Sequence, residues 1–189
     1  MKKQIIIAVV LSLTPLAAFA GPSLGIAYSN VGLSGHSGRP GIQISAGNLY
    51  SNNVVATGSA TFARGFYGVH ADLGKLIPAG GVSFTPYASL GFLNLNYQQQ
   101  FQPSIQDVYG LAGVNLNIPI DSKVALQFGG GYGHTLTTYG GTGGAVYKGK
   151  AAFDFGLAKH VFADLDATYL HVPGQSVTEY GAGMRYHFS

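Results

Sequence analysis

The chain has 189 residues, with 10 Lys and Arg against 7 Asp and Glu, and only 9% of its residues are charged while 47% are hydrophobic. A soluble domain carries about 25% charged residues, so the composition argues against a surface that faces water throughout. The charge is close to balanced once Lys2 and Lys3 are set aside, which removes the basic face that nucleic-acid binding requires, and the lack of cysteine excludes disulfides and thiol chemistry.

The first 20 residues have the pattern of a secretory signal peptide. Lys2 and Lys3 precede an apolar run over 5–13, Pro15 interrupts it, and small residues stand at Ala18 and Ala20. We expect cleavage after Ala20, which leaves residues 21–189 as one domain. That domain has no further apolar run long enough for a membrane-spanning helix, and Gly21 in place of a cysteine gives no sign of a lipid anchor.

The remaining chain alternates between apolar and polar residues at a period of two, in segments of about ten residues separated by turn-rich pieces. No long window of good helix formers interrupts the alternation. The segments predict ten β-strands, with eight as the alternative because glycine blurs their limits. They cover residues 24–33, 41–48, 54–63, 66–75, 82–97, 105–118, 124–137, 146–158, 162–171 and 179–188.

The connections alternate in character along the chain. Compact turns are expected near 50–53, 76–81, 119–123 and 158–160, whereas most of the other connections are longer and more polar. An even number of strands joined in this way leaves both ends of the domain on the same side of the sheet, the side of the short turns.

Alternation alone does not separate a soluble β-sandwich from a membrane barrel, so the polar face decides. In a sandwich that face meets water and is rich in Lys and Glu, whereas here it is mostly Ser, Thr, Gly, Asn and Gln with a few charges. Tyrosines near the strand ends also suit the aromatic girdles at a membrane interface. We therefore expect an all-β fold, a closed antiparallel transmembrane barrel whose apolar face meets lipid.

The last strand, "EYGAGMRYHF", places Tyr180, Met184, Tyr186 and Phe188 on one face. With the signal peptide and the even set of strands, it makes the chain resemble the small outer-membrane β-barrels of Gram-negative bacteria, the class of OmpA and OmpX. The spacing of "GVHADLGKLIPAGG" and "YGLAGVNLNIPI" is also similar to YfaZ-like members.

That resemblance implies a location and partners. It implies an outer-membrane protein with both termini in the periplasm, in contact with outer-membrane lipid and lipopolysaccharide. In this class the last strand is a recognition signal for the barrel assembly machinery, and here Tyr180, Met184, Tyr186 and Phe188 would form it, although Ser189 follows the terminal aromatic residue.

Strand parity assigns the charged residues to the lumen. Hairpin register places Asp154, Asp164 and Asp166 together, with Arg185 and His187 to compensate them. If the pair is dry, Arg185→Ala should cost on the order of 3 kcal/mol, because carboxylates would be left uncompensated. Other polar residues expected in the lumen are His70, Asp72, Lys148, Lys150 and Glu179.

Two functions fit such a lumen. A salt-bridged, largely filled polar lumen gives a structural barrel that serves membrane integrity, and a narrow polar path past the carboxylates gives a cation-preferring, porin-like channel. Gly129, Gly131 and Gly133 would either open that path or make room for large side chains such as Tyr87.

A third function, a lipid-modifying enzyme, has less support. No spacing links His36, His134 or His171 to both a nucleophile and an orienting acid. The six histidines form no i, i+2 or i+4 pair, and the glycine-rich stretches carry no lysine at the spacing of a phosphate-binding loop. We expect a protein that is not an enzyme and has no metal or cofactor.

Overall fold

The computed structural model describes residues 22–34, 38–96 and 104–188. The expected signal peptide and His36 lie outside these ranges. No helix in the described ranges has the length and hydropathy to cross a membrane. The strands are β1 (Ser23–Leu33), β2 (Arg39–Leu49), β3 (Val54–Ala63), β4 (Phe66–Lys75), β5 (Ile77–Ala79), β6 (Val82–Leu95), β7 (Ile105–Pro119), β8 (Val124–Tyr139), β9 (Ala145–Ala158), β10 (Val161–Val172) and β11 (Gln175–His187).

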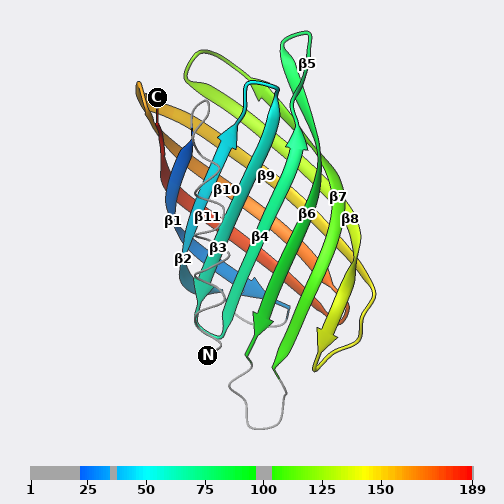
Figure 1. The fold of residues 1–189 in the computed structure, drawn as a ribbon. Coiled ribbons are helices and arrows are strands. Elements are labelled where there is room, and N and C mark those ends of the chain that lie inside the picture. The colour runs from blue at the N-terminus through cyan, green and yellow to red at the C-terminus, as the bar shows by residue number, and fades with distance from the viewer. Residues whose placement is uncertain (1–21, 35–37, 97–103, 189) are drawn as a thin grey trace.

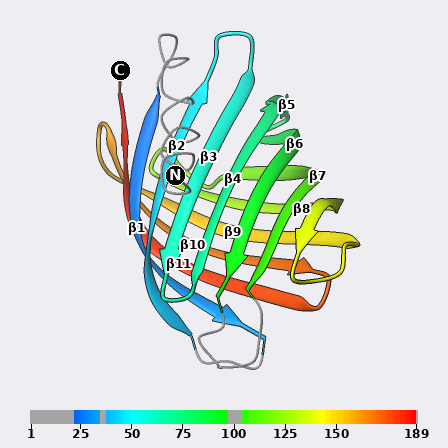
Figure 2. The ribbon, with the colours of Figure 1, turned by 60° about the horizontal axis from the view of Figure 1, so that its bottom comes forward.

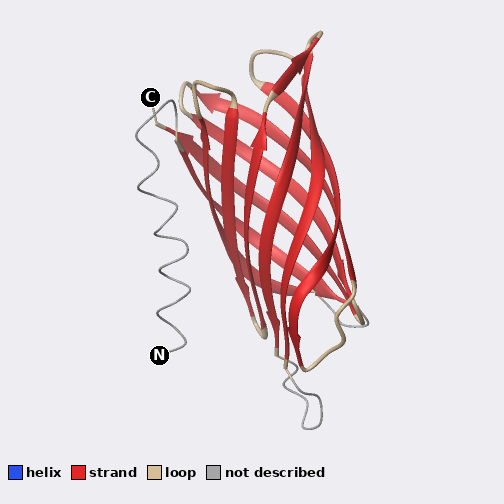
Figure 3. Cartoon of the chain, turned by 45° about the vertical axis from the view of Figure 1, so that its right-hand side comes forward, coloured by secondary structure: helices blue, strands red, loops and turns tan. Residues whose placement is uncertain are grey.

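The strands form a closed antiparallel barrel (Figures 1 and 2). Each strand of the ring pairs with the next one along the chain, with β4 pairing directly with β6 past β5, and β1 pairs with β11 along the whole length of β1. Ten strands therefore surround the lumen, which confirms the predicted fold, and every described element in the wall is a strand (Figure 3). Closure leaves no strand of the ring with an unpaired edge.

The short strand β5 was not expected, because residues 76–81 were predicted to be a compact turn. Ile77, Pro78 and Ala79 pair with the start of β6 and extend this hairpin beyond the rim of the barrel (Figure 1). Gly80 and Gly81 make the turn at φ values of 58° and 95°, which L side chains rarely adopt. The hairpin belongs to the end of the barrel where β1 begins and β11 ends, which we call the terminal end; the opposite end is the distal end.

The outward face of the barrel is a continuous apolar belt. The strand residues exposed there are large and apolar on every side, for example Ile26 on β1, Leu90 on β6, Phe128 on β8, Leu165 on β10 and Met184 on β11. Between the rims, the Asp, Glu, Lys and Arg side chains of the strands alternate with these residues and lie on the inward face. The belt is what the alternation in the sequence predicted.

The distal half of the lumen is filled by apolar side chains, a feature that the expected polar lumen did not include. Its members come from most strands of the ring and are almost inaccessible to solvent. This distal plug consists of Val31, Leu33, Phe66, Tyr87, Leu93, Leu95, Tyr109, Leu111, Val146, Val172 and Val177. Near the distal strand ends the pattern inverts: Val31, Leu93 and Val177 point inward, whereas their neighbours Asn30, Asn94 and Thr178 lie on the outward face. Reasoning that assumed a polar inward face therefore did not detect the plug.

Glycines in the wall make room for the two tyrosines of the plug. A Cβ atom on Gly131 would lie 3.0 Å from the Tyr87 hydroxyl, and one on Gly91 would collide with the Tyr109 ring. The glycines of β8 were expected either to open a path or to make room for a large side chain. At Gly131 the structure shows the second role, because Tyr87 occupies the space. Tyr87 lies at the boundary between the distal plug and the polar half of the lumen, whose cavity it also lines.

Candidate functional site

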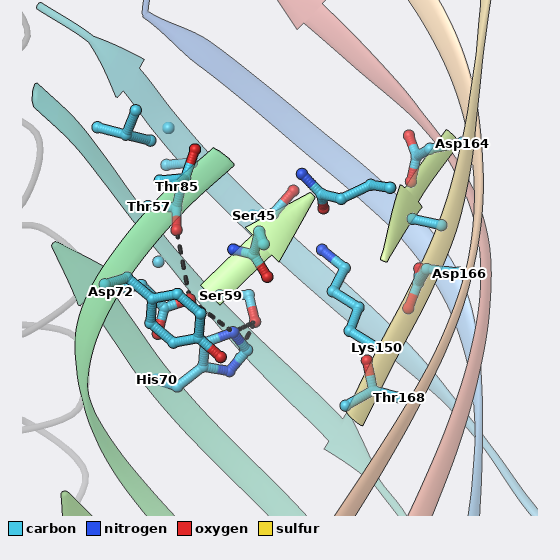
Figure 4. Close-up of a pocket in the computed structure, with 18 of the residues that line it drawn as sticks. Ser45, Thr57, Ser59, His70, Asp72, Thr85, Lys150, Asp164, Asp166 and Thr168 are labelled. Atoms are coloured by element: carbon cyan, nitrogen blue, oxygen red, sulfur yellow. Dashed lines mark hydrogen bonds and ion pairs between the residues drawn. The ribbon is translucent and has the colours of Figure 1, made fainter. Parts of the chain in front are cut away.

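The terminal half of the lumen holds a polar cavity of about 200 Å³ (Figure 4). Strands on all sides contribute to it, because inward positions recur at every second residue along each strand. Its lining extends from Ser23 and Gly47 near the terminal rim to Tyr87 on the distal plug. The charged and titratable residues that line it are His70, Asp72, Lys148, Lys150, Asp164, Asp166 and Arg185.

Arg185 on β11 holds two of the three carboxylates that were expected to cluster. Its Nη2 atom donates a hydrogen bond of 2.9 Å to Asp154 Oδ1 and lies 4.0 Å from Asp164 Oδ1. The two aspartates face each other across the β9–β10 pair. The Arg185 and Asp154 side chains keep 31% and 24% of their exposure, so water still reaches this pair.

Asp166 and His187 stand apart from that pair. Asp166 is two residues further along β10, away from the terminal end, and forms no ion pair or hydrogen bond with any residue that the structure describes. It is the diagonal neighbour of Lys150, which faces Thr168 in the β9–β10 register. The His187 ring packs edge-on against Phe162 at a centroid distance of 4.9 Å, and no carboxylate among the described residues contacts it.

On the other side of the cavity, His70 and Asp72 of β4 meet Lys148 of β9. Lys148 Nζ lies 3.8 Å from Asp72 Oδ2, and His70 Nε2 lies 4.0 Å from the same oxygen. The Lys148 side chain keeps only 8% of its exposure. Strands β4 and β9 are not neighbours in the barrel, so this contact crosses the lumen. Strand parity placed these residues inside the barrel but had no means of pairing them.

Glu179 lies deeper and is held by uncharged donors from three strands. Its Oε1 atom accepts hydrogen bonds from Ser29 Oγ at 2.9 Å, Gln43 Nε2 at 2.9 Å and Thr61 Oγ1 at 2.8 Å. These donors belong to β1, β2 and β3, so the carboxylate links β11 to the strands across the closure of the barrel. The sequence marked Glu179 only as a polar lumen residue.

The residues of the expected assembly signal all point outward at the terminal strand. Tyr180, Met184 and Tyr186 alternate along β11 and are exposed, and Phe188 directly follows the strand. The Phe188 amide donates a hydrogen bond of 2.8 Å to the carbonyl oxygen of Pro22, so pairing with the first strand continues past the end of β11. The rings of Tyr186 and Phe188 meet edge-on at 4.9 Å.

Two further contacts escaped the sequence analysis. Asp107 is 1% exposed in the distal half, and Thr138 on β8 is the residue that faces it across the β7–β8 pair. Near the distal rim, His171 Nδ1 lies 2.9 Å from Ser176 Oγ, which direct cross-strand pairing explains. No carboxylate in the described ranges contacts His171, so the pair lacks the acid that would complete a catalytic triad.

The described residues form no metal centre. Within the described part of the chain, no three His, Cys, Asp or Glu side chains are placed to hold a metal ion. Asp154 and Asp164 are the nearest approach to an acidic ligand set, and Arg185 already occupies the space between them.

Comparison with known proteins identifies the fold but not a family. The chain matches no protein-family model and no curated protein sequence. Among solved structures it is similar to the β domain of the Bordetella autotransporter BrkA, at 12% identity over 90% of this chain and 100% of that chain, with a TM-score of 0.54.

Two other solved structures are similar over most of their length. The translocator domain of the autotransporter NalP from Neisseria meningitidis is 12% identical over 100% of this chain and 95% of that chain, with a TM-score of 0.52. The NanC porin is 9% identical over 85% and 98%, with a TM-score of 0.51. At these identities the likeness is one of fold, a closed β-barrel shared by autotransporter domains and porins.

Proposed function

We propose that this chain is an integral outer-membrane β-barrel with a structural role, whose lumen is closed to solute flow. The apolar belt supports the membrane location, because a surface of exposed Leu, Ile, Phe and Tyr side chains on every side of the barrel requires an apolar solvent. Closure supports it as well, since hydrocarbon cannot satisfy open strand edges. Lipid and lipopolysaccharide would surround the belt.

The distal plug is the observation that carries the structural role. It fills the distal half of the lumen with buried apolar side chains, and its members Leu95 and Val146 have no exposed surface at all. An ion that passed this region would lose most of its hydration among mainly apolar side chains, although Asp107 is also buried in this half. The barrel therefore holds together the strands that span the bilayer and does not offer a path through it.

A cation-preferring channel remains the second candidate, because Asp72, Asp164 and Asp166 line the polar cavity. That function would require the distal plug to move. The sequence suggested a conducting path because it predicted carboxylates in the lumen. It did not reveal the distal plug, which lies beyond the charged half.

Conductance of the refolded mature chain in a planar bilayer tests the proposal. We expect no discrete current steps from the wild-type chain, because the distal plug blocks the lumen. The double variant Leu93→Ala, Tyr109→Ala should introduce steps, because it removes two buried side chains from the plug and leaves a void beside Gly91. Leu165→Ala, on the outward face, is the matched control and should remain silent.

Cation-selective steps from the wild-type chain, diminished in Asp166→Asn, would replace the structural role with the channel. Folding of each variant is checked by its far-UV circular dichroism and by its resistance to denaturation in detergent, so that silence is read only from folded protein.

A further inference from the structure

The polar cavity has the shape of a binding pocket with one entrance. Its lining reaches the terminal rim at Ser23 and Gly47, and at the other end Tyr87 closes it against the distal plug. A volume of about 200 Å³ is many times the space that a single water molecule needs, so a small organic solute fits. A solute that enters from the terminal end must leave by the same way.

Most of the charged groups in this cavity are already paired. Arg185 is bonded to Asp154 and lies beside Asp164, and Lys148 lies 3.8 Å from Asp72. Lys150 and Asp166 are the exceptions among the lining charges that the structure describes, because neither forms an ion pair or a hydrogen bond. They are diagonal neighbours on the same inward face, and Figure 4 shows Lys150 reaching into the cavity from the wall that carries Asp164 and Asp166.

A buried acceptor beside these two groups also lacks a hydrogen bond. Asp164 Oδ1 is shielded from solvent, and the Arg185 Nη2 atom next to it is 4.0 Å away, beyond hydrogen-bond distance. Leaving a buried carboxylate oxygen without a donor is costly, so this site favours an occupant that brings N–H or O–H groups. Lys150 carries the complementary charge: its ammonium group attracts Asp166 but forms no ion pair or hydrogen bond with it.

We propose that the cavity binds a small zwitterionic solute of amino-acid size. The anionic group of the solute is held by Lys150, and its ammonium group donates to Asp166 and to Asp164 Oδ1, which accepts no hydrogen bond from a described residue. A solute that carried only one of the two charges would interact with one of the two groups and gain no attraction from the other. This inference goes beyond the structural role and does not depend on whether the barrel conducts.

Isothermal titration of the refolded mature chain in detergent micelles tests the proposal with three probes. The probes are β-alanine, which carries both charges, propanoate, which carries the anion alone, and ethylammonium, which carries the cation alone, all at equal ionic strength. We expect saturable binding of β-alanine in the millimolar range and no saturation by either single-charge probe. Failure of β-alanine to bind to folded protein, or equal binding of one single-charge probe, would overturn the proposal.

Variants assign the binding to the cavity. Lys150→Met and Asp166→Asn should each weaken β-alanine binding by at least about tenfold, because each removes one of the two charged partners. Lys159→Met, at the exposed turn between β9 and β10, is the matched control and should bind as the wild type does. Asp166→Asn is nearly isosteric and breaks no ion pair, so it should fold; unchanged binding in that variant refutes the site.

Discussion

The carboxylates in the lumen differ in the groups that donate hydrogen bonds to them. Arg185 satisfies Asp154 with a charged hydrogen bond, whereas Glu179 is held by three uncharged donors, Ser29, Gln43 and Thr61. A carboxylate oxygen that accepts from three strands at once restrains their relative positions, because all three donors must keep their rotamers to reach it. Glu179 therefore acts as a link between β11 and the first three strands.

Glu179→Ala should lower the free energy of unfolding by about 2–4 kcal/mol, because three part-buried donors lose one shared acceptor. The urea midpoint of the chain refolded in lipid vesicles measures the change. Glu179→Gln keeps one carbonyl oxygen at nearly the same place and should lose less. Equal losses in the two variants would mean that the charge rather than the three-strand link matters, and no loss in Glu179→Ala would show that the link is absent.

We expect the cost of removing Arg185 to be smaller than the sequence suggested. The expected value of about 3 kcal/mol assumed a dry pair, but the Arg185 and Asp154 side chains keep 31% and 24% of their exposure. Water screens the pair and hydrates Asp154 when its partner is removed, so we expect Arg185→Ala to cost about 1–2 kcal/mol.

A double-mutant cycle with Asp154→Asn separates the pair from the rest of the Arg185 side chain. The coupling energy between the two substitutions should account for most of the loss in Arg185→Ala, since the 2.9 Å hydrogen bond is its main polar contact. A coupling energy near zero would assign the loss to packing of the arginine stem instead.

On strands β6, β7 and β8, glycines lie next to the two buried tyrosines and make room for their rings. Tyr109 on β7 faces Gly91 on β6, and the ring occupies the space where a Cβ atom of residue 91 would stand. The distal plug can therefore hold a large aromatic side chain within the fixed diameter of the ring. The alternation of these strands did not reveal this, because glycine is compatible with either face.

Gly91→Ala should destabilise the barrel by about 1–3 kcal/mol, because the new methyl group collides with a ring that is itself buried. The same urea titration measures it. Gly149→Ala on β9 is the matched control, since an added Cβ there meets no atom within 4 Å, and its stability should stay within about 0.5 kcal/mol of wild type. Equal stability of the two variants would show that Tyr109 moves aside without cost.

The whole molecule divides at mid-height into a distal half filled by apolar side chains and a terminal half with a polar cavity. The interior thus distinguishes the two ends of the barrel, as do the β5–β6 hairpin and the two chain ends at the terminal end. Under the proposed function the terminal end, with its short turns and both ends of the domain, faces the periplasm, and the cavity opens there.

The absence of cysteine from the sequence makes this orientation directly testable. A membrane-impermeant maleimide added to intact cells should label Gly141→Cys, which lies in the connection between β8 and β9 at the distal end. Lys159→Cys, in the turn between β9 and β10 at the terminal end, should react only after the outer membrane is permeabilised. The reverse labelling pattern would invert the proposed topology.

Alternation along single strands, together with the few charges on the polar face, predicted a closed barrel of about ten strands and its apolar outer face. Residues such as Asp154, between Phe153 and Phe155, show why: side chains of adjacent strand residues point to opposite faces, so a local pattern assigns each residue to a side. Hairpin register is also nearly local: it predicted Asp154 level with Asp164 or Asp166, and the structure pairs it with Asp164.

Contacts across the lumen were decided by the tertiary structure alone. Lys148 reaches Asp72, Glu179 reaches Gln43 and Thr61, and the residues of the distal plug meet in one cluster, although each pair is far apart in sequence. These contacts depend on the diameter of the closed ring and on the height of each residue within it, which follow from strand number and stagger rather than from any single strand. The sequence by itself determined which side chains enter the lumen, and closure of the ring determined which of them meet.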